Sequence, residues 1–327
     1  MVKRVLSGVA FGLSMLALAG SAQAQSYPNK PITIIVPFAA GGPTDIVARV
    51  IAAQFSSSLG QQAVVENVVG AAGTIGMVRA ARAAPDGYTL LLAGMSTMSF
   101  SPTVYPNIQA HSINSFEPVG IVASAPIVLT VAKQVPANNV KEFADHLRGM
   151  GDKVNNGHAG VGSSSHLACA LVNQRLGGKA SVVPYKGTSQ IMHDMLAGQI
   201  HFLCDQTTSV MTQVQAGGIK ALAVLAQQRS PALPNVPTIS EAGYPGAEMV
   251  LWNAIFAPKG TPPEIVRQLN AAIAKGVDAP AAQKQFSELG AEAPGVGQRS
   301  SEALGKALAS DIEKWGKVIR DAGIQAN

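Results

Sequence analysis

The chain has 327 residues, of which 24 are Lys or Arg and 19 are Asp or Glu, giving a net charge of +5. The charges are scattered, without a basic run and without interleaved aromatic residues, which argues against a nucleic-acid-binding protein. Removing residues 1–24, which contain two basic residues and no acid, leaves 5 − 2 = +3. This mild positive excess is compatible with an anionic ligand. About 300 residues then remain, enough to bury the cores of two lobes.

The first 24 residues have the features of a signal peptide. Lys3 and Arg4 precede an apolar run over residues 5–19, and Ala22-Gln23-Ala24 has the small-x-small pattern of a cleavage site. The apolar run is shorter than the roughly 20 residues that a membrane-spanning helix needs. No cysteine follows the small residues, so we expect no lipid anchor. The sequence therefore predicts export to the periplasm with cleavage after Ala24.

Short β-branched runs then alternate with patterns of helical period. We predict strands at 32–36, 64–67, 89–93, 127–132, 182–185, 200–204, 219–225 and 252–257. We predict helices at 44–55, 140–148, 167–176, 189–197, 264–275, 281–289 and 301–322. Residues 229–245 contain four prolines and should be extended. Alternating strands and helices predict an α/β protein with parallel sheets and right-handed crossovers.

Two loops that follow predicted strands are rich in small residues. The first runs from Phe38 to Asp45 and opens a helix; the second, from Gly160 to His166, adds three serine hydroxyls. In parallel sheets, ligands bind beyond the carboxyl ends of the strands, where helix N-termini favour negative charge. Neither loop has the lysine of a phosphate-binding P-loop, and the first strand is not followed by GxGxxG. The two loops therefore predict a site for a carboxylate and argue against a nucleotide.

Other candidates follow from their positions after strands. Ser96 and Thr97 do so in the first half of the chain, and Tyr185 and Asp205 in the second, where Asp205 could orient a donor or cap a helix. Met95, Met98, Phe100 and Trp252 are candidates for either core or pocket wall. A cleft bounded by Met98 and Phe38 would suit a planar apolar ligand. The residues expected to contact the ligand are Phe38, Ala39, Gly42, Pro43, Thr44, Asp45, Ser96, Thr97, Met98, Gly162, Ser163, Ser164, Ser165, His166, Tyr185 and Asp205.

Catalytic and metal-binding alternatives find little support. The serine run lacks the closing glycine of GxSxG, and although His166 lies three residues from Ser163, no base with an orienting partner is evident. The six histidines show no HExxH or comparable spacing, so we expect no metal site. Cys169 and Cys204 are the only cysteines. They could pair in an oxidising compartment or be two buried apolar residues.

Several motifs, spread in order over the mature chain, resemble the Bug family of receptors, the solute-binding components of tripartite tricarboxylate transporters. The motifs are ITIIVPFAAGGPTDIVAR ending at Arg49, NVVGAAGTIG at 67–76, PDGYTL at 85–90, GSSSHL at 162–167, PYKG at 184–187, RSPALP at 229–234 with VPT at 236–238, and FAPKGTP at 256–262. Members bind citrate, amino acids, nicotinate or aromatic acids. Among them the chain is most similar to the terephthalate-binding member.

The resemblance implies a two-domain α/β fold of the periplasmic-binding-protein type (type II, Venus-flytrap), with parallel-rich sheets and a ligand cleft between the lobes. We expect residues 25–125 with 227–327 in domain 1 and 126–226 in domain 2, closing about crossovers near Ala125 and Ala226. The implied function is capture of a small carboxylate, such as terephthalate, for membrane permease subunits. It involves no catalysis and no cofactor, and we expect a monomer. The alternatives are citrate or another aliphatic or amino-acid carboxylate as the ligand, a signalling protein as the partner, and a secreted serine hydrolase as the function.

Overall fold

The computed structural model describes residues 27–110 and 112–325. The predicted signal peptide, its cleavage site after Ala24 and His111 lie outside the described residues. The strands are β1 (Ile32–Val36), β2 (Ala63–Asn67), β3 (Thr89–Gly94), β4 (Phe116–Ala132), β5 (Asn155–His158), β6 (Ser181–Pro184), β7 (Phe202–Gln206), β8 (Ile219–Leu225) and β9 (Val250–Pro258). The α-helices are α2 (Pro43–Leu59), α3 (Thr74–Ala81), α4 (Ser101–Val104), α5 (Val140–Met150), α6 (Ser164–Arg175), α7 (Thr188–Leu196), α8 (Thr207–Gln215), α9 (Pro263–Val277), α10 (Pro280–Glu288) and α11 (Ser301–Asp321).

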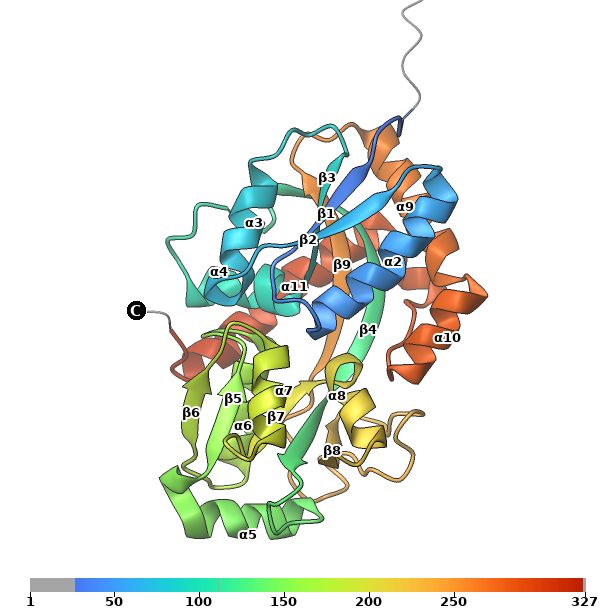
Figure 1. Ribbon diagram of the computed structural model, residues 1–327. Helices are drawn as coiled ribbons and strands as arrows, with labels where there is room; N and C mark the ends of the chain where they lie inside the picture. The colour runs from blue at the N-terminus through green and yellow to red at the C-terminus, as the bar shows by residue number, and fades with distance from the viewer. Residues whose placement is uncertain (1–26, 111, 326–327) are drawn as a thin grey trace, which may run out of the picture.

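One long strand, β4, links two bodies (Figure 1). Its first part, up to Pro126, pairs with β9 in a sheet that continues through β3 and β1 to β2. From Ile127 onward it pairs with β7 and β8, and this second sheet continues through β5 to β6. The change of partners falls beside Ala125, and Ala226 directly follows β8. The predicted crossover near Ala125 therefore coincides with a place where the chain passes between the two sheets. The one near Ala226 does not, because Thr238 and Met249 still pair with β8 and the chain returns to the first sheet only at Val250. The division into domains stays a prediction.

The expected parallel pairing holds for only part of each sheet. Strands β2 and β3 are parallel to β1, and β6 and β7 are parallel to β5. Strands β4 and β9, in contrast, are antiparallel to each of their partners. Strand β4 runs from the first sheet into the second, and β9 runs back beside the first part of β4 in the opposite direction. The result is a mixed sheet with helices on its faces.

Strand β1 shows how the sequence divides the core of the first body. Ile32, Ile34 and Val36 pack with helices α2 and α9 on one face, and Ile35 packs on the other face. This alternation is the period of two that a sheet buried on both sides requires. Helix α2 begins with Pro43, where the missing N–H costs no helical hydrogen bond. The packed strand and helix hold the loop between them in place.

The two cysteines are buried and unbridged. The backbone N–H of Cys204 donates to Sγ of Cys169 at 3.0 Å. Burial raises the pKa of the Cys204 thiol well above its ordinary value. The structure therefore has the pair as small core residues, which was one of the two interpretations left open by the sequence.

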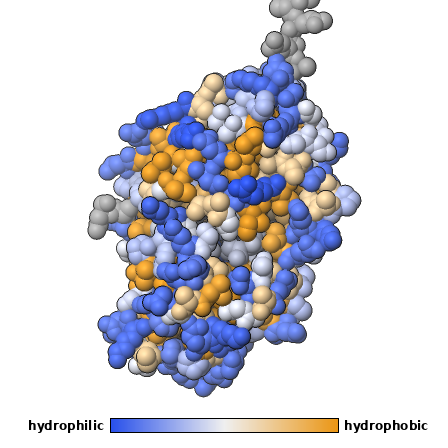
Figure 2. Space-filling view, in the orientation of Figure 1, coloured by the Kyte–Doolittle hydropathy of each residue, from blue (hydrophilic) through white to orange (hydrophobic). Residues whose placement is uncertain are grey.

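The surface in Figure 2 is hydrophilic along its outline, with separate apolar patches nearer the middle of this face. Among the described helices, none has both the length and the apolar character that crossing a bilayer would demand.

Candidate functional site

A cavity lies where the two bodies meet. The cavity has a volume of about 20 Å³. That is room for one or two water molecules. The two bodies are therefore nearly closed on each other. The lining residues are Phe38, Gly42, Pro43, Thr44, Gly94, Met95, Ser96, Ala159, Ser163, Ser164, Ser165, Thr188, Asp205, Gln206 and Leu251.

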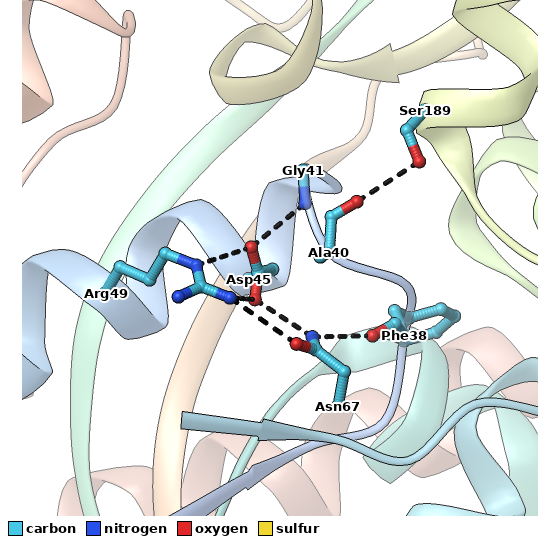
Figure 3. Close-up of polar contacts among 7 residues, drawn as sticks. All are labelled: Phe38, Ala40, Gly41, Asp45, Arg49, Asn67 and Ser189. Atoms are coloured by element: carbon cyan, nitrogen blue, oxygen red, sulfur yellow. Dashed lines mark hydrogen bonds and ion pairs between the residues drawn. The ribbon is translucent and has the colours of Figure 1, made fainter. Parts of the chain in front are cut away.

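The loop before α2 is held in shape by Asp45 (Figure 3). Its side chain, 2% exposed, forms an ion pair with the half-exposed Arg49 at 2.9 Å. It also accepts hydrogen bonds from the Gly41 N–H and from Nδ2 of Asn67, each at 2.9 Å. The same Nδ2 atom donates to the carbonyl of Phe38. Burial alone would raise the pKa of Asp45, but the hydrogen bonds from Arg49, Gly41 and Asn67 outweigh burial and lower it. The carboxylate is therefore a fixed internal anion that shapes the loop.

The serine loop before α6 divides its hydroxyls between two tasks. Oγ of Ser163 accepts the His166 N–H and caps the helix, and it lies 3.1 Å from Oγ of Ser165. Oγ of Ser165 accepts the N–H of Ala159. Ser164, by contrast, makes no side-chain hydrogen bond within the described residues. Ser163 and Ser165 therefore hold the loop in shape, and the Ser164 hydroxyl remains available to a ligand.

Three hydroxyls that line the cavity have no partner in the described part of the chain. They belong to Thr44 on α2, Ser96 after β3 and Ser164 on α6. Thr44 and Ser96 come from the first body and Ser164 from the second. The three residues are only 4%, 6% and 8% exposed. A hydroxyl group that faces a cavity and has no partner in the protein can donate to or accept from a ligand or water. The hydroxyls thus point to a polar occupant held from both sides.

The electrostatics of the cavity wall favour an anion. The N-terminal turns of α2, α6, α7 and α8 all contribute to its wall. Each helix start leaves N–H groups without intrahelical partners and carries partial positive charge. Among the described residues, no lysine or arginine lines the cavity. An anion bound here would be held by neutral donors.

Among the described residues that line the cavity, Asp205 is the one with an ionisable side chain. It is the penultimate residue of β7, in which every residue is buried, and it is 1% exposed. Oδ2 contacts Oγ1 of Thr188 at 2.5 Å, and Oδ1 accepts the N–H of Gln206 at 2.9 Å. Burial raises the pKa of Asp205 despite these hydrogen bonds. The part of the cavity near α7 and α8 therefore already contains an acid of the protein itself.

The structure brings most of the expected loop residues to the cavity and directs others elsewhere in the first body. Ala39 faces the second body, where it packs against Gly187. Asp45 is turned towards Gly41 and Arg49, as described above. Thr97 is fully buried, with Oγ1 directed at the carbonyl of Ala72 at 3.4 Å. Met98 has no exposed surface and lies in the core, so of the two expected apolar walls only Phe38 lines the cavity.

Three expected residues of the second body also lie outside the lining. Gly162 donates its N–H to Nδ1 of His166 at 3.2 Å, so both help to fix the loop. The Tyr185 hydroxyl donates to Oδ2 of Asp194 at 2.6 Å. Met95, for which the sequence left core and pocket wall open, lines the cavity. The lining also includes residues not expected from the sequence: Gly94, Ala159, Thr188, Gln206 and Leu251. Thr188 is the first residue of α7 and follows Gly187. The two loops recognised from the sequence also contain glycine just before a helix.

Within residues 27–110 and 112–325, the hydroxyls of Ser163, Ser164 and Ser165 form no hydrogen bond with a side-chain base. Nδ1 of His166 accepts the Gly162 N–H, and its ring stacks on His158 with centroids 4.3 Å apart. Burial, together with the neighbouring His158, lowers the pKa of His166 to about 4. A ring that is occupied in this way is poorly placed as the general base that an activated serine needs. The geometry thus fits binding better than acyl transfer.

Four side-chain hydrogen bonds among the described residues join the two bodies. The hydroxyl of Tyr105 donates to the carbonyl of Val161 at 2.8 Å, and Oγ of Ser189 donates to the carbonyl of Ala40 at 3.1 Å (Figure 3). Nδ2 of Asn253 donates to Oε1 of Gln206 at 3.1 Å. Oγ1 of Thr207 donates to the carbonyl of Gly290 at 2.7 Å. These contacts stabilise the closed arrangement.

Comparison with known proteins places this geometry in a family. The family model "Tripartite tricarboxylate transporter family receptor" matches residues 47–324. The structure of the periplasmic binding protein BugD is 39% identical, with a TM-score of 0.89, and the match covers 92% of this chain and 100% of BugD. The expected α/β periplasmic-binding-protein fold is confirmed by this likeness.

Two further solved structures contain bound acids. MatC (Rpa3494) from Rhodopseudomonas palustris, with bound malate, is 36% identical with a TM-score of 0.86, covering 90% of this chain and 100% of MatC. Rpa4515 from R. palustris, with adipate, is 33% identical with a TM-score of 0.87, covering 91% of this chain and 99% of that protein. The likeness to a terephthalate-binding member is narrower and stays a prediction. The chain belongs to the tripartite tricarboxylate transporter receptor family of periplasmic solute-binding proteins.

Proposed function

We propose that this chain captures a small carboxylate between its two bodies and delivers it, as a monomer, to the permease subunits of a tripartite transporter. The proposal rests chiefly on one observation. The hydroxyls of Thr44, Ser96 and Ser164, which have no partner among the described residues, line a cavity on which four helix N-termini converge. Hydroxyl and backbone N–H groups are the neutral donors that suit a carboxylate. The bound malate and adipate of the two related structures support the same ligand class.

We further propose that the chain reaches the periplasm through cleavage after Ala24, and that residues 25–125 with 227–327 move against 126–226. Opening is required because the cavity has room for little more than water. Closure by hinge motion would then restore the contacts between the bodies. Neutral donors would hold the acid reversibly, as release to a permease requires.

The candidate ligands differ in which groups of the cavity wall would bind them. Phe38, Met95 and Leu251 supply apolar surface, which supports an aromatic dicarboxylate such as terephthalate. The hydroxyls and Gln206 would serve an aliphatic acid equally well, so malate, adipate, citrate and aspartate are the alternatives. In each case binding would involve no change of the ligand and no cofactor.

Titration calorimetry of the mature protein against terephthalate, malate, adipate, citrate and aspartate tests the proposal. We expect saturable heat with at least one of these acids, and a higher melting temperature with the same acid because it binds only the folded state. Absence of both effects with every acid would overturn the proposed function.

A further inference from the structure

The contact between Thr188 and Asp205 limits how an anion can bind. The two oxygens, Oγ1 of Thr188 and Oδ2 of Asp205, are 2.5 Å apart, and Oδ1 already accepts the Gln206 N–H. Thr188 and Asp205 are 4% and 1% exposed, and both line the cavity. At this distance a proton lies between the two oxygens. Either the Thr188 hydroxyl or a protonated Asp205 carboxyl group can donate it.

The Thr188 hydroxyl has a single proton to donate. With Asp205 ionised, Thr188 must donate that proton to the carboxylate, and none is left for a ligand. The cavity then presents a negative charge without a neighbouring cation. With Asp205 protonated, the carboxyl group donates to Oγ1, and the Thr188 proton is free to point at a ligand oxygen. The charge that would repel an anion is removed at the same time.

We propose that capture of a carboxylate is coupled to uptake of one proton by Asp205, which turns Thr188 from a donor to Asp205 into a donor to the ligand. The inference rests on the proposed function and adds the uptake of one proton to the binding step. The proton comes from solvent, and no covalent bond other than the O–H bond of Asp205 forms. Asp205 is a positioning residue in this scheme, because it acts on the ligand through Thr188.

The raised pKa of Asp205 agrees with this scheme, since burial already favours the protonated carboxyl group. A bound carboxylate would favour it further. Affinity should therefore be greatest at pH values below the pKa of Asp205 in the free protein. It should weaken as pH rises towards the pKa in the complex. A fully coupled proton gives a tenfold weaker affinity for each pH unit in that window.

Other titratable groups surround β7, and the test must separate them from Asp205. The strand packs against β4, β5, α6, α7 and α8. The titratable side chains on β7 itself and on these elements are Glu117, His158, His166, Cys169, Arg175, His193, Asp194 and Cys204. The pKa values of His158 and His166 are lowered by burial, so their protonation belongs to the acid end of the range. The variant Asp205→Asn isolates the acid because it keeps every other group and fixes a neutral amide beside Thr188.

The experiment is calorimetry of the mature protein with malate and terephthalate between pH 5.5 and 8.5, in buffers of different ionisation enthalpy. We expect proton uptake approaching one per ligand and an affinity that falls with pH in the native protein. Asp205→Asn should show neither the uptake nor the pH slope, whatever its affinity, and it also serves as the control for titration of the ligand. Thr188→Val should weaken binding and reduce the pH slope, and Thr188→Ser should restore both.

Two outcomes separate this inference from the proposed function. Binding of an acid with no proton uptake, or with a pH slope that Asp205→Asn retains, overturns the proton coupling and leaves the receptor function standing. Absence of binding with either acid and with the remaining acids of the screen, at every pH, overturns both. Carboxyl ¹³C NMR of Asp205 gives an independent check, since its titration should move to higher pH in the complex.

Discussion

Ser163 and Ser164 are neighbours with different predicted roles, and exchanging each for alanine tests the site. Ser164 makes no side-chain hydrogen bond within the described residues and lines the cavity. Ser163 caps α6 by accepting the His166 N–H at 3.2 Å. Ser164→Ala should therefore remove a ligand contact without changing the stability of the fold, whereas Ser163→Ala should lower that stability.

The magnitudes follow from these contacts. A hydrogen bond to a charged group contributes about 1.5–3 kcal/mol. Ser164→Ala should therefore weaken carboxylate binding roughly 10- to 150-fold. Its free energy of unfolding should change by less than about 0.5 kcal/mol, because no intramolecular contact is lost. Loss of the cap in Ser163→Ala should lower the free energy of unfolding by about 1 kcal/mol.

Calorimetry with the tightest-binding acid of the screen measures the affinities, and urea denaturation of the ligand-free proteins measures stability. The native protein and the two variants form a matched set. Native affinity in Ser164→Ala would refute the assignment of this hydroxyl to the ligand. Equal loss of stability in both variants would refute the division of roles in the serine loop.

Three more predictions follow from individual contacts. Asp45→Asn should be less stable than the native protein at pH 7, with the difference disappearing in urea denaturation as pH falls through about 4 and below, because the lowered pKa of Asp45 stabilises the fold only while the group is ionised. Protonation of His166, whose pKa is lowered to about 4, should reduce native stability as pH falls from about 6.5 to 4, and His166→Gln should flatten that dependence. A Cβ at Gly187 would lie 2.7 Å from Cβ of Ala39 across the closed contact. Gly187→Ala should therefore weaken binding and enlarge the molecule in X-ray scattering, while the control Gly149→Ala, with no atom within 4 Å, should do neither.

Local sequence patterns were sufficient for most elements of the fold. The β-branched run of β1 and the proline at the start of α2 act within a few residues, and both elements form where expected. The pattern was weaker where burial comes from distant parts of the chain. Strand β5 (Asn155–His158) consists of polar residues and glycine, and it forms because β6 and β7 lie on either side of it. The sequence analysis predicted no strand at these residues.

The orientation of strands could not follow from alternation of elements alone. The first part of β4 was not predicted as a strand, and its antiparallel partner β9 follows more than a hundred residues later. Likewise, sequence position identified Asp45 as a candidate but not the direction of its side chain, which Arg49 and Asn67 determine. Thr188 joins the cavity because β5, β7 and α7 pack together. Such placements depend on tertiary contacts that no local motif contains.

The contacts between the bodies should set how long a ligand stays bound, and Tyr105 tests this. Its hydroxyl donates to Val161 across the closure, while the hydroxyl of Tyr27 donates to Gly87 at 2.7 Å within the first body. Each bond should contribute about 1 kcal/mol, so Tyr27→Phe and Tyr105→Phe should lose similar stability. Only Tyr105→Phe should also bind about fivefold more weakly, through faster release. Stopped-flow release rates that change equally in both variants, or in neither, would show that this contact does not control closure.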